Sequence, residues 1–262
     1  MGFNKIVIAS ISLFTLALFG LTYISWNKKS KTIDFASIEN KRKGESISGI
    51  QEQYDNFVKN LGNSTTIVKP AVLTSNDTLH LSMSIELLDS MRQYGYAAYL
   101  SERLATINKS WYRHSQSSRY YLMENYSNNN PTNSLMYYQR AKVNLEKSLE
   151  LNPNNNSAKI DLAICVKTIN DVLPPSDPLA FMQPAKLLLD VVKNDSNNAD
   201  AQYYLGRLAV ESNQYEKAIV RLKKVVSLQP QNKEIFSEIA EIYQLMGNDK
   251  EAKQWLEKAN NN

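Results

Sequence analysis

The chain has 262 residues, enough for one large or two small domains, and its 43% hydrophobic content supports a packed core. Glycine and proline number only eight each, and no strand-like alternation of apolar and polar residues stands out, so we predict an all-α protein. The net charge is +4, and residues 1–43 carry seven basic and two acidic side chains, which leaves the rest of the chain slightly negative. The nearly neutral remainder argues against nucleic-acid binding, which requires a basic face on the folded domain.

The first predicted element is an apolar run at residues 6–24 that contains no charged side chain. At about 1.5 Å per residue, its length suits a bilayer core of about 30 Å. We predict one transmembrane helix here, so that residues 1–30 form an anchor with a basic flank and the lipid bilayer is a partner. A cleavable secretory signal is the alternative, although no A-x-A site follows the run. The basic cluster behind the run is expected to rest on anionic headgroups.

Residues 31–77 are predicted to form a spacer with one helix. Between residues 47 and 61, apolar side chains recur at helical spacing, whereas the flanks are polar and contain glycine. The helix-spaced residues are Ile47, Ile50, Tyr54, Phe57, Val58 and Leu61.

Five helix pairs are predicted in residues 78–262. The first pair covers 79–91 and 96–107 with a break near Gly95, and the second covers 111–126 and 134–151. The third begins at Ser157 and has nine inserted residues in its turn, where Pro174, Pro175 and Pro178 lie. The last two pairs, residues 199–232 and 233–262, are the most regular.

A spacing of 34 residues relates the last two pairs, because Leu205, Gly206 and Ala218 recur as Ile239, Ala240 and Ala252. The third pair has the same pattern 43 residues earlier, which is one period plus the nine inserted residues. The predicted repeat positions are Ala158, Leu162, Ala163, Leu205, Gly206, Ala218, Pro230, Ile239, Ala240 and Ala252. An ordinary pair of amphipathic helices predicts no such correspondence.

Each type of repeat residue has a physical reason. Gly206 has no Cβ, which lets the two helices of its pair approach closely. Asn213 and Gly247 lie where the chain between helices requires a positive φ, and Pro230 follows a helix that it cannot continue. The period therefore predicts helical hairpins that nest against one another in an α-solenoid.

Residues that could carry out chemistry are sparse. One cysteine and two histidines, far apart in sequence, do not form a metal-binding pattern, and no phosphate-binding loop or nucleophile elbow occurs. Carboxylates are scattered over helix surfaces, so we predict no enzyme activity, no cofactor and no small-molecule substrate. Cys165 lies between apolar neighbours, and we expect a buried, unreactive thiol.

A concave surface made from the first helix of each pair is the predicted binding region for a protein or peptide partner. Its candidate residues are offset from the packing positions: Tyr112, Arg113, Gln116, Arg119, Ile160, Asp161, Ile164, Lys167, Tyr203, Tyr204 and Arg207. Tyrosine and arginine are frequent anchors because they combine a large contact area with a polar end. The alternative is that the tyrosines fill gaps between helices, which we expect for more than half of those between Tyr94 and Tyr138.

Four segments carry a resemblance to a known family: 158–165 (AKIDLAIC), 181–184 (FMQP), 201–206 (AQYYLG) and 214–219 (QYEKAI). With the 34-residue period, they resemble the tetratricopeptide repeat (TPR) over roughly residues 78–262. With the predicted anchor and spacer, the chain is similar to membrane-anchored bacterial TPR proteins, in particular the haem-lyase-associated TPR subunit of cytochrome c-type biogenesis. Chaperone-binding TPR domains carry a carboxylate-gripping Lys and Asn set, but Tyr203 and Arg207 stand at the matching places.

The resemblance implies a scaffold that binds apocytochrome tails or assembly partners without holding haem. It also implies that the TPR domain lies on the outer side of the inner membrane. The basic residues beside the span, one before it and three after it, favour the cytoplasmic side instead. The alternative function is a general envelope, secretion or assembly scaffold unrelated to haem.

Overall fold

The computed structural model of the chain describes residues 76–128 and 131–261. The predicted span at 6–24, its basic flank and the predicted helix at 47–61 lie outside these residues. Within the described ranges, no helix combines the length and the apolar character needed to cross a bilayer.

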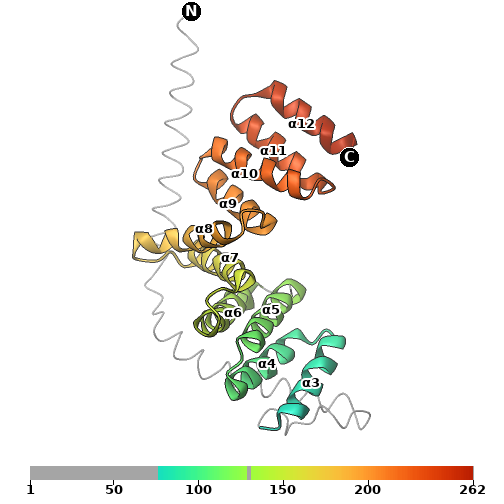
Figure 1. Cartoon of the computed structure of the whole chain (residues 1–262), viewed down its shortest axis with the longest axis vertical. Helices are drawn as coiled ribbons and strands as arrows, with labels where there is room; N and C mark the ends of the chain where they lie inside the picture. Colours follow the sequence, from blue (N-terminus) through green and yellow to red (C-terminus); the bar gives the residue numbers. More distant parts are fainter. Residues whose placement is uncertain (1–75, 129–130, 262) are drawn as a thin grey trace, which may run out of the picture. The chain divides into compact units, whose positions relative to one another are not determined.

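The described residues form ten α-helices and one 3-10 helix, with no strand (Figure 1). The prediction of an all-α fold is confirmed for this part of the chain. In order, the elements are α3 (Thr78–Ser90), α4 (Tyr94–Asn108), α5 (Trp111–Asn128), α6 (Pro131–Leu151), α7 (Asn156–Val172), η3 (Pro178–Met182), α8 (Gln183–Asn194), α9 (Ala199–Glu211), α10 (Tyr215–Leu228), α11 (Lys233–Leu245) and α12 (Asp249–Asn261).

The helices pack in sequence order. The hairpins are α3 with α4, α5 with α6, α7 with α8, α9 with α10, and α11 with α12. Successive hairpins join where the second helix of one packs against the first helix of the next. The nested hairpins that the 34-residue period predicted are therefore present in the described residues.

Asx side chains begin several of these helices. The Asp77 carboxylate accepts backbone hydrogen bonds at the start of α3, and Asn155 and Asn198 do the same for α7 and α9. The amide oxygen of Asn198 lies 3.0 Å from the Ala201 nitrogen. Each cap satisfies a backbone donor that has no partner within its helix, which fixes where the helix starts.

Residues with a positive φ, in the left-handed conformation, follow the first helix of several hairpins. Asn213 has φ 57° and Gly247 has φ 73°, which confirms the prediction of a positive φ at both turns. The predicted break near Gly95 lies two residues earlier, at residues 91–93, because Gly95 is inside α4 and Arg92 supplies the left-handed turn with φ 56°. Glycine is not required at such a position, although other residues adopt it at a cost.

The second hairpin has a shorter turn than predicted. The predicted helices 111–126 and 134–151 leave too wide a gap, because α5 continues to Asn128 and α6 begins at Pro131. Proline suits the first turn of a helix, since its missing N–H has no partner there in any case.

The nine inserted residues lie in the turn of the third hairpin, as predicted. The chain leaves α7 after Val172, passes the prolines and forms η3, whose first turn Asp177 caps through a hydrogen bond to the Leu179 nitrogen of 2.9 Å. Helix α8 then begins at Gln183.

Buried repeat positions form the cores between the helices. One cluster joins α10 and α11 through Ala218, Leu222, Ile235 and Ile239, and a second joins α7, α8 and α9 around Ala163 and Leu188. All the predicted repeat residues are buried except Pro230, which follows the end of α10. They are Ala158, Leu162, Ala163, Leu205, Gly206, Ala218, Ile239, Ala240 and Ala252.

Candidate functional site

A pocket of about 310 Å³ lies between α7, α8 and α9, and we call it the α7–α9 pocket. It brings together five of the predicted groove residues: Ile164, Lys167, Tyr203, Tyr204 and Arg207. The other lining residues are Ala163, Thr168, Pro184, Leu188, Leu208 and Glu211. Ile164 and Lys167 are three apart on α7, and Arg207 follows Tyr203 and Tyr204 by four and three residues on α9, so Lys167 and Arg207 are surface neighbours of the residues before them.

The basic groups of the α7–α9 pocket are paired with carboxylates. Lys167 Nζ lies 2.6 Å from Asp171 Oδ2 and 3.1 Å from Glu211 Oε2. Partial burial opposes the charge on Lys167, but these two acidic partners outweigh it and raise its pKa. The Arg207 guanidinium lies 3.6 Å from Glu238 Oε1. The pocket thus has a polar rim with little net charge.

The wall on the α9 side is aromatic. The rings of Tyr203 and Tyr204 meet edge to face with centroids 5.3 Å apart. The Tyr203 hydroxyl donates to Glu238 Oε1 at 2.8 Å and accepts from Arg207 Nη1 at 3.2 Å, which fixes the position of its ring. Burial and the hydrogen bond to Glu238 raise the pKa of Tyr203. An aromatic wall with apolar Ile164 and Leu208 nearby can hold an apolar side chain while the rim binds backbone groups.

Ile160 does not lie in the groove, and its prediction as a binding residue is wrong. Its side chain is 7% exposed and packs in the core cluster with Leu188 and Val191. Ile160 lies one turn before Ile164 on α7, and α8 packs over Ile160. The position of α8 depends on the path of the inserted residues, and helical periodicity does not predict that path.

Asp161 lies half-buried on α7 among charged neighbours. Burial raises its pKa to about 6; the cation of Arg119 opposes this rise, and the carboxylate of Asp200 adds to it. A carboxyl group with a pKa near 6 changes charge within the physiological range. Asp161 lies outside the set of residues that line the α7–α9 pocket.

The four α5 candidates also lie outside the α7–α9 pocket. Tyr112 is 57% exposed, and Arg113 donates to the Gln116 side chain at 2.7 Å. Arg119 Nη2 donates to Ser157 Oγ at 3.0 Å, which connects α5 to α7. The structure therefore brings five of the seven candidates of the third and fourth hairpins into one pocket and leaves those of the second hairpin apart.

The described residues hold no group of three or more His, Cys, Asp or Glu side chains arranged to bind a metal ion. His114 is buried, and its Nδ1 lies 2.9 Å from the Asn144 side-chain oxygen. Cys165 is fully buried, as predicted, and burial raises the pKa of its thiol to about 12. A thiol in this environment is a packing group, since the thiolate is the reactive form.

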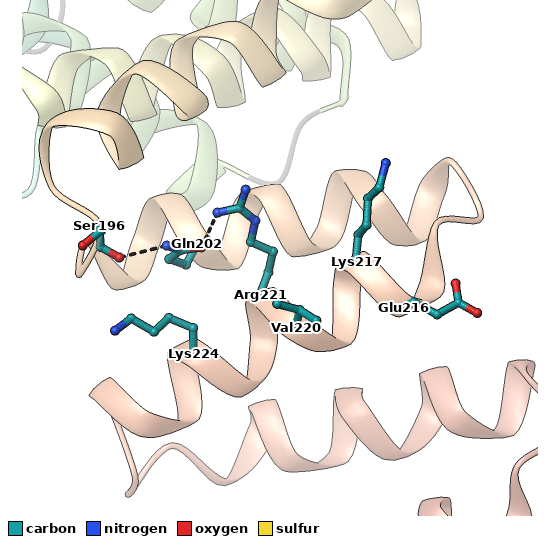
Figure 2. Close-up of a pocket in the computed structure, with 7 residues that line it drawn as sticks. All are labelled: Ser196, Gln202, Glu216, Lys217, Val220, Arg221 and Lys224. Carbon is teal, nitrogen blue, oxygen red and sulfur yellow. Dashed lines mark hydrogen bonds between the residues drawn. The ribbon is translucent and has the colours of Figure 1, made fainter.

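A second pocket, of about 570 Å³, was missed by the sequence analysis (Figure 2). We call it the α9–α10 pocket. Its lining residues are Ser196, Gln202, Glu216, Lys217, Val220, Arg221 and Lys224, and it shares none of them with the α7–α9 pocket. Lys217, Arg221 and Lys224 recur at spacings of four and three on α10, a basic stripe that was visible in the sequence. The stripe lies on the second helix of its hairpin, whereas all the predicted binding residues lie on first helices.

Stacked helical hairpins with small residues at a 34-residue period define the class of helical-repeat proteins. Residues 209–262 match the family model of the tetratricopeptide repeat. No curated protein sequence matches the chain.

Solved structures share the fold at low sequence identity. MamA from Desulfovibrio magneticus RS-1 superimposes with a TM-score of 0.57 at 19% identity, covering 71% of this chain and 94% of that one. Another MamA crystal structure gives a TM-score of 0.55 at 17% identity, with coverages of 70% and 89%. YrrB, a TPR protein with an unusual peptide-binding site, gives 0.51 at 16% identity, with coverages of 74% and 91%. These similarities establish a TPR fold for the described hairpins.

Proposed function

We propose that the chain is a non-enzymatic scaffold and that its α7–α9 pocket binds an extended segment of a protein partner. The supporting observation is the convergence of Tyr203, Tyr204, Arg207, Ile164 and Lys167 from two hairpins on one pocket. Its volume of about 310 Å³ suits one or two side chains of a peptide. The fold similarity to YrrB, a peptide-binding TPR protein, supports the same mode.

The chemistry of the pocket favours an apolar or aromatic anchor residue in the partner. Because Lys167 and Arg207 already pair with carboxylates, a charged anchor would have to displace an existing partner. An apolar side chain can pack against the Tyr204 ring and leave the Lys167–Glu211 and Arg207–Glu238 pairs intact.

Selection of peptides from a random display library on the purified full-length protein tests this proposal. We expect enrichment of sequences with a central aromatic or apolar residue. The selected peptides should bind about tenfold more weakly to Tyr204→Ala, because the substitution removes one aromatic contact. Tyr112→Ala is the matched control, because Tyr112 is an exposed tyrosine outside the pocket. If Tyr204→Ala binds the peptides as tightly as Tyr112→Ala does, and both variants unfold at the same temperature as the natural chain, the partner binds elsewhere.

The location of this scaffold in the cell and the identity of its partner are proposed from the sequence. We propose that residues 6–24 anchor the chain in the inner membrane, with the TPR domain on the outer side, and that the partner is an apocytochrome or another factor of cytochrome c maturation. A general envelope scaffold is the alternative. A reporter fused after Asn262 that is active only on the cytoplasmic side would contradict the orientation, and a deletion strain with normal c-type haem content would contradict the role in cytochromes.

A further inference from the structure

The α9–α10 pocket carries three cationic side chains on one face of α10. Lys217, Arg221 and Lys224 extend over two helical turns, and the only acidic residue in the lining is Glu216. In Figure 2 the Glu216 carboxylate points away from the three cationic groups. The positive charge of the lining is therefore not cancelled by the neighbouring acid.

Arg221 is held in place by a chain of hydrogen bonds. Its Nη1 donates to Gln202 Oε1 at 2.8 Å, and Gln202 Nε2 donates to the Ser196 carbonyl at 2.9 Å (Figure 2). Gln202 is only 5% exposed, so its amide is fixed by its surroundings. The bond to Gln202 uses one of the five N–H donors of the guanidinium and leaves its charge intact. A guanidinium fixed in this way loses little conformational entropy when it binds a carboxylate.

The charges of this pocket differ from those at the corresponding place of the preceding hairpin. Throughout residues 76–128 and 131–261, none of the three cations belongs to an ion pair. Lys217 donates to the neutral side chain of Gln214 at 2.7 Å. By contrast, Lys159, which occupies the position of Gln202 one hairpin earlier, pairs with Asp190 on α8. The fourth hairpin thus presents positive charge where the third neutralises it.

The spacing of Lys217 and Arg221 is close to that of alternate side chains in an extended peptide. From Lys217 to Lys224 the helix advances about 10 Å, at about 1.5 Å per residue. An extended chain covers the same length in about three residues, at about 3.3 Å each. Alternate side chains of such a segment lie about 6.6 Å apart on one face, close to the advance of about 6 Å between Lys217 and Arg221. Val220, 68% exposed, lies between them and can contact an apolar residue.

We propose that the α9–α10 pocket is a second binding site of this protein, and that it takes an extended acidic peptide segment with glutamate or aspartate at alternate positions beside an apolar residue. The charge complementarity of three unpaired cations carries the proposal. A concave site with a half-buried arginine suits a peptide better than a flat lipid surface, and its length of about two helical turns is short for a nucleic-acid backbone. The site is independent of the α7–α9 pocket and adds to the proposed function.

The test measures binding of a fluorescein-labelled ten-residue peptide with three alternating glutamates and one leucine to the full-length protein. Its counterpart with glutamines in place of the glutamates is the ligand control. We expect saturable binding of the glutamate peptide alone, weakened at least tenfold in the double variant Lys217→Glu/Lys224→Glu and in Arg221→Gln. We also expect the affinity to fall as salt is raised.

The matched control variant is Lys250→Glu/Lys253→Glu, which makes the same change in net charge at exposed positions of α12. Equal weakening by the control, or binding of the glutamine peptide with the same affinity, would overturn the proposal. Failure of the glutamate peptide to bind would also overturn it. A further contrary result would be that Lys217→Glu/Lys224→Glu abolishes binding of a single-stranded oligonucleotide or of phosphatidylserine vesicles but leaves peptide binding unchanged. Tyr204→Ala is expected to leave the affinity unchanged, which separates this site from the α7–α9 pocket.

Discussion

Gly206 shows how closely single residues control the packing of a hairpin. A Cβ at this position would lie 3.0 Å from Leu222 Cδ2 and 3.2 Å from Leu222 Cγ on α10. Leu222 is fully buried in the core cluster, so it has little room to move away. A larger side chain at residue 206 must therefore separate α9 from α10.

We expect Gly206→Leu to lower the free energy of unfolding by about 1–3 kcal/mol through overpacking. Chemical denaturation of the purified protein, followed by far-ultraviolet circular dichroism, gives this value. Leu222→Ala in the same chain should recover part of the loss, because it removes the side chain that the new leucine meets. Gly206→Leu with an unchanged denaturation midpoint would mean that α9 and α10 do not approach as described.

At the scale of single residues, the sequence predicted the positions that need a positive φ or a small side chain. It did not predict the burial of residues by helices that pack over them. Asn213, Gly247 and Gly206 have roles that follow from their own chemistry and the period. Arg92 has a positive φ that its residue type does not suggest. Ile160 is buried because α8 arrives over it, a tertiary effect that no helical spacing reveals.

The second hairpin is held together by buried polar groups as well as by apolar ones. His114 on α5 bonds to Asn144 on α6, and Ser148 Oγ donates to the Trp111 carbonyl at 3.0 Å. His114, Asn144 and Ser148 are all buried, so each needs a partner within the protein. These bonds fix the register of α5 against α6.

Asn144→Leu should destabilise the protein by about 1–3 kcal/mol, because it leaves the His114 ring buried without its acceptor. The measurement is the midpoint of urea denaturation at constant slope. The double variant His114→Leu/Asn144→Leu removes both polar partners and should recover much of the loss. A single variant as stable as the natural chain would show that the bond does not contribute to this interface.

Helix boundaries were predictable where the sequence carries caps or prolines, and less so elsewhere. The inserted turn of the third hairpin follows from Pro174, Pro175 and Pro178, and it lies where expected. The pairing of α5 with α6 relies on His114 and Asn144, polar residues that helical periodicity assigns to no core. The α7–α9 pocket was predictable in part, because five of its lining residues lie on the first helices of two hairpins, where the groove was expected. The α9–α10 pocket is lined mainly by α10, a second helix, on which only packing positions were predicted.

For the described residues as a whole, packing between neighbours in sequence has an energetic consequence. Each helix packs closely on the helices before and after it, so stability should be a sum of hairpin terms and interface terms. Distant hairpins share no core and are coupled only through those between them. Local damage should therefore remain local.

Ile239→Ala provides the test, because Ile239 is fully buried between α10 and α11. The substitution should cost about 2–5 kcal/mol by leaving a cavity. In native-state hydrogen exchange we expect faster exchange of amides in α10, α11 and α12, with those of α3 to α6 unchanged. The milder Ile239→Val should give the same pattern at smaller amplitude. Uniform acceleration across all helices would instead indicate one cooperative unit.

The left-handed turns at Asn213 and Gly247 are 34 residues apart and occupy the same phase of consecutive hairpins. A gene segment of 34 codons copied between these two points would rejoin each turn to an equivalent one, so no new loop would need to evolve. The array can thus lengthen or shorten by whole units through recombination, and each added unit would bring a fresh pair of surfaces on which new specificities could arise.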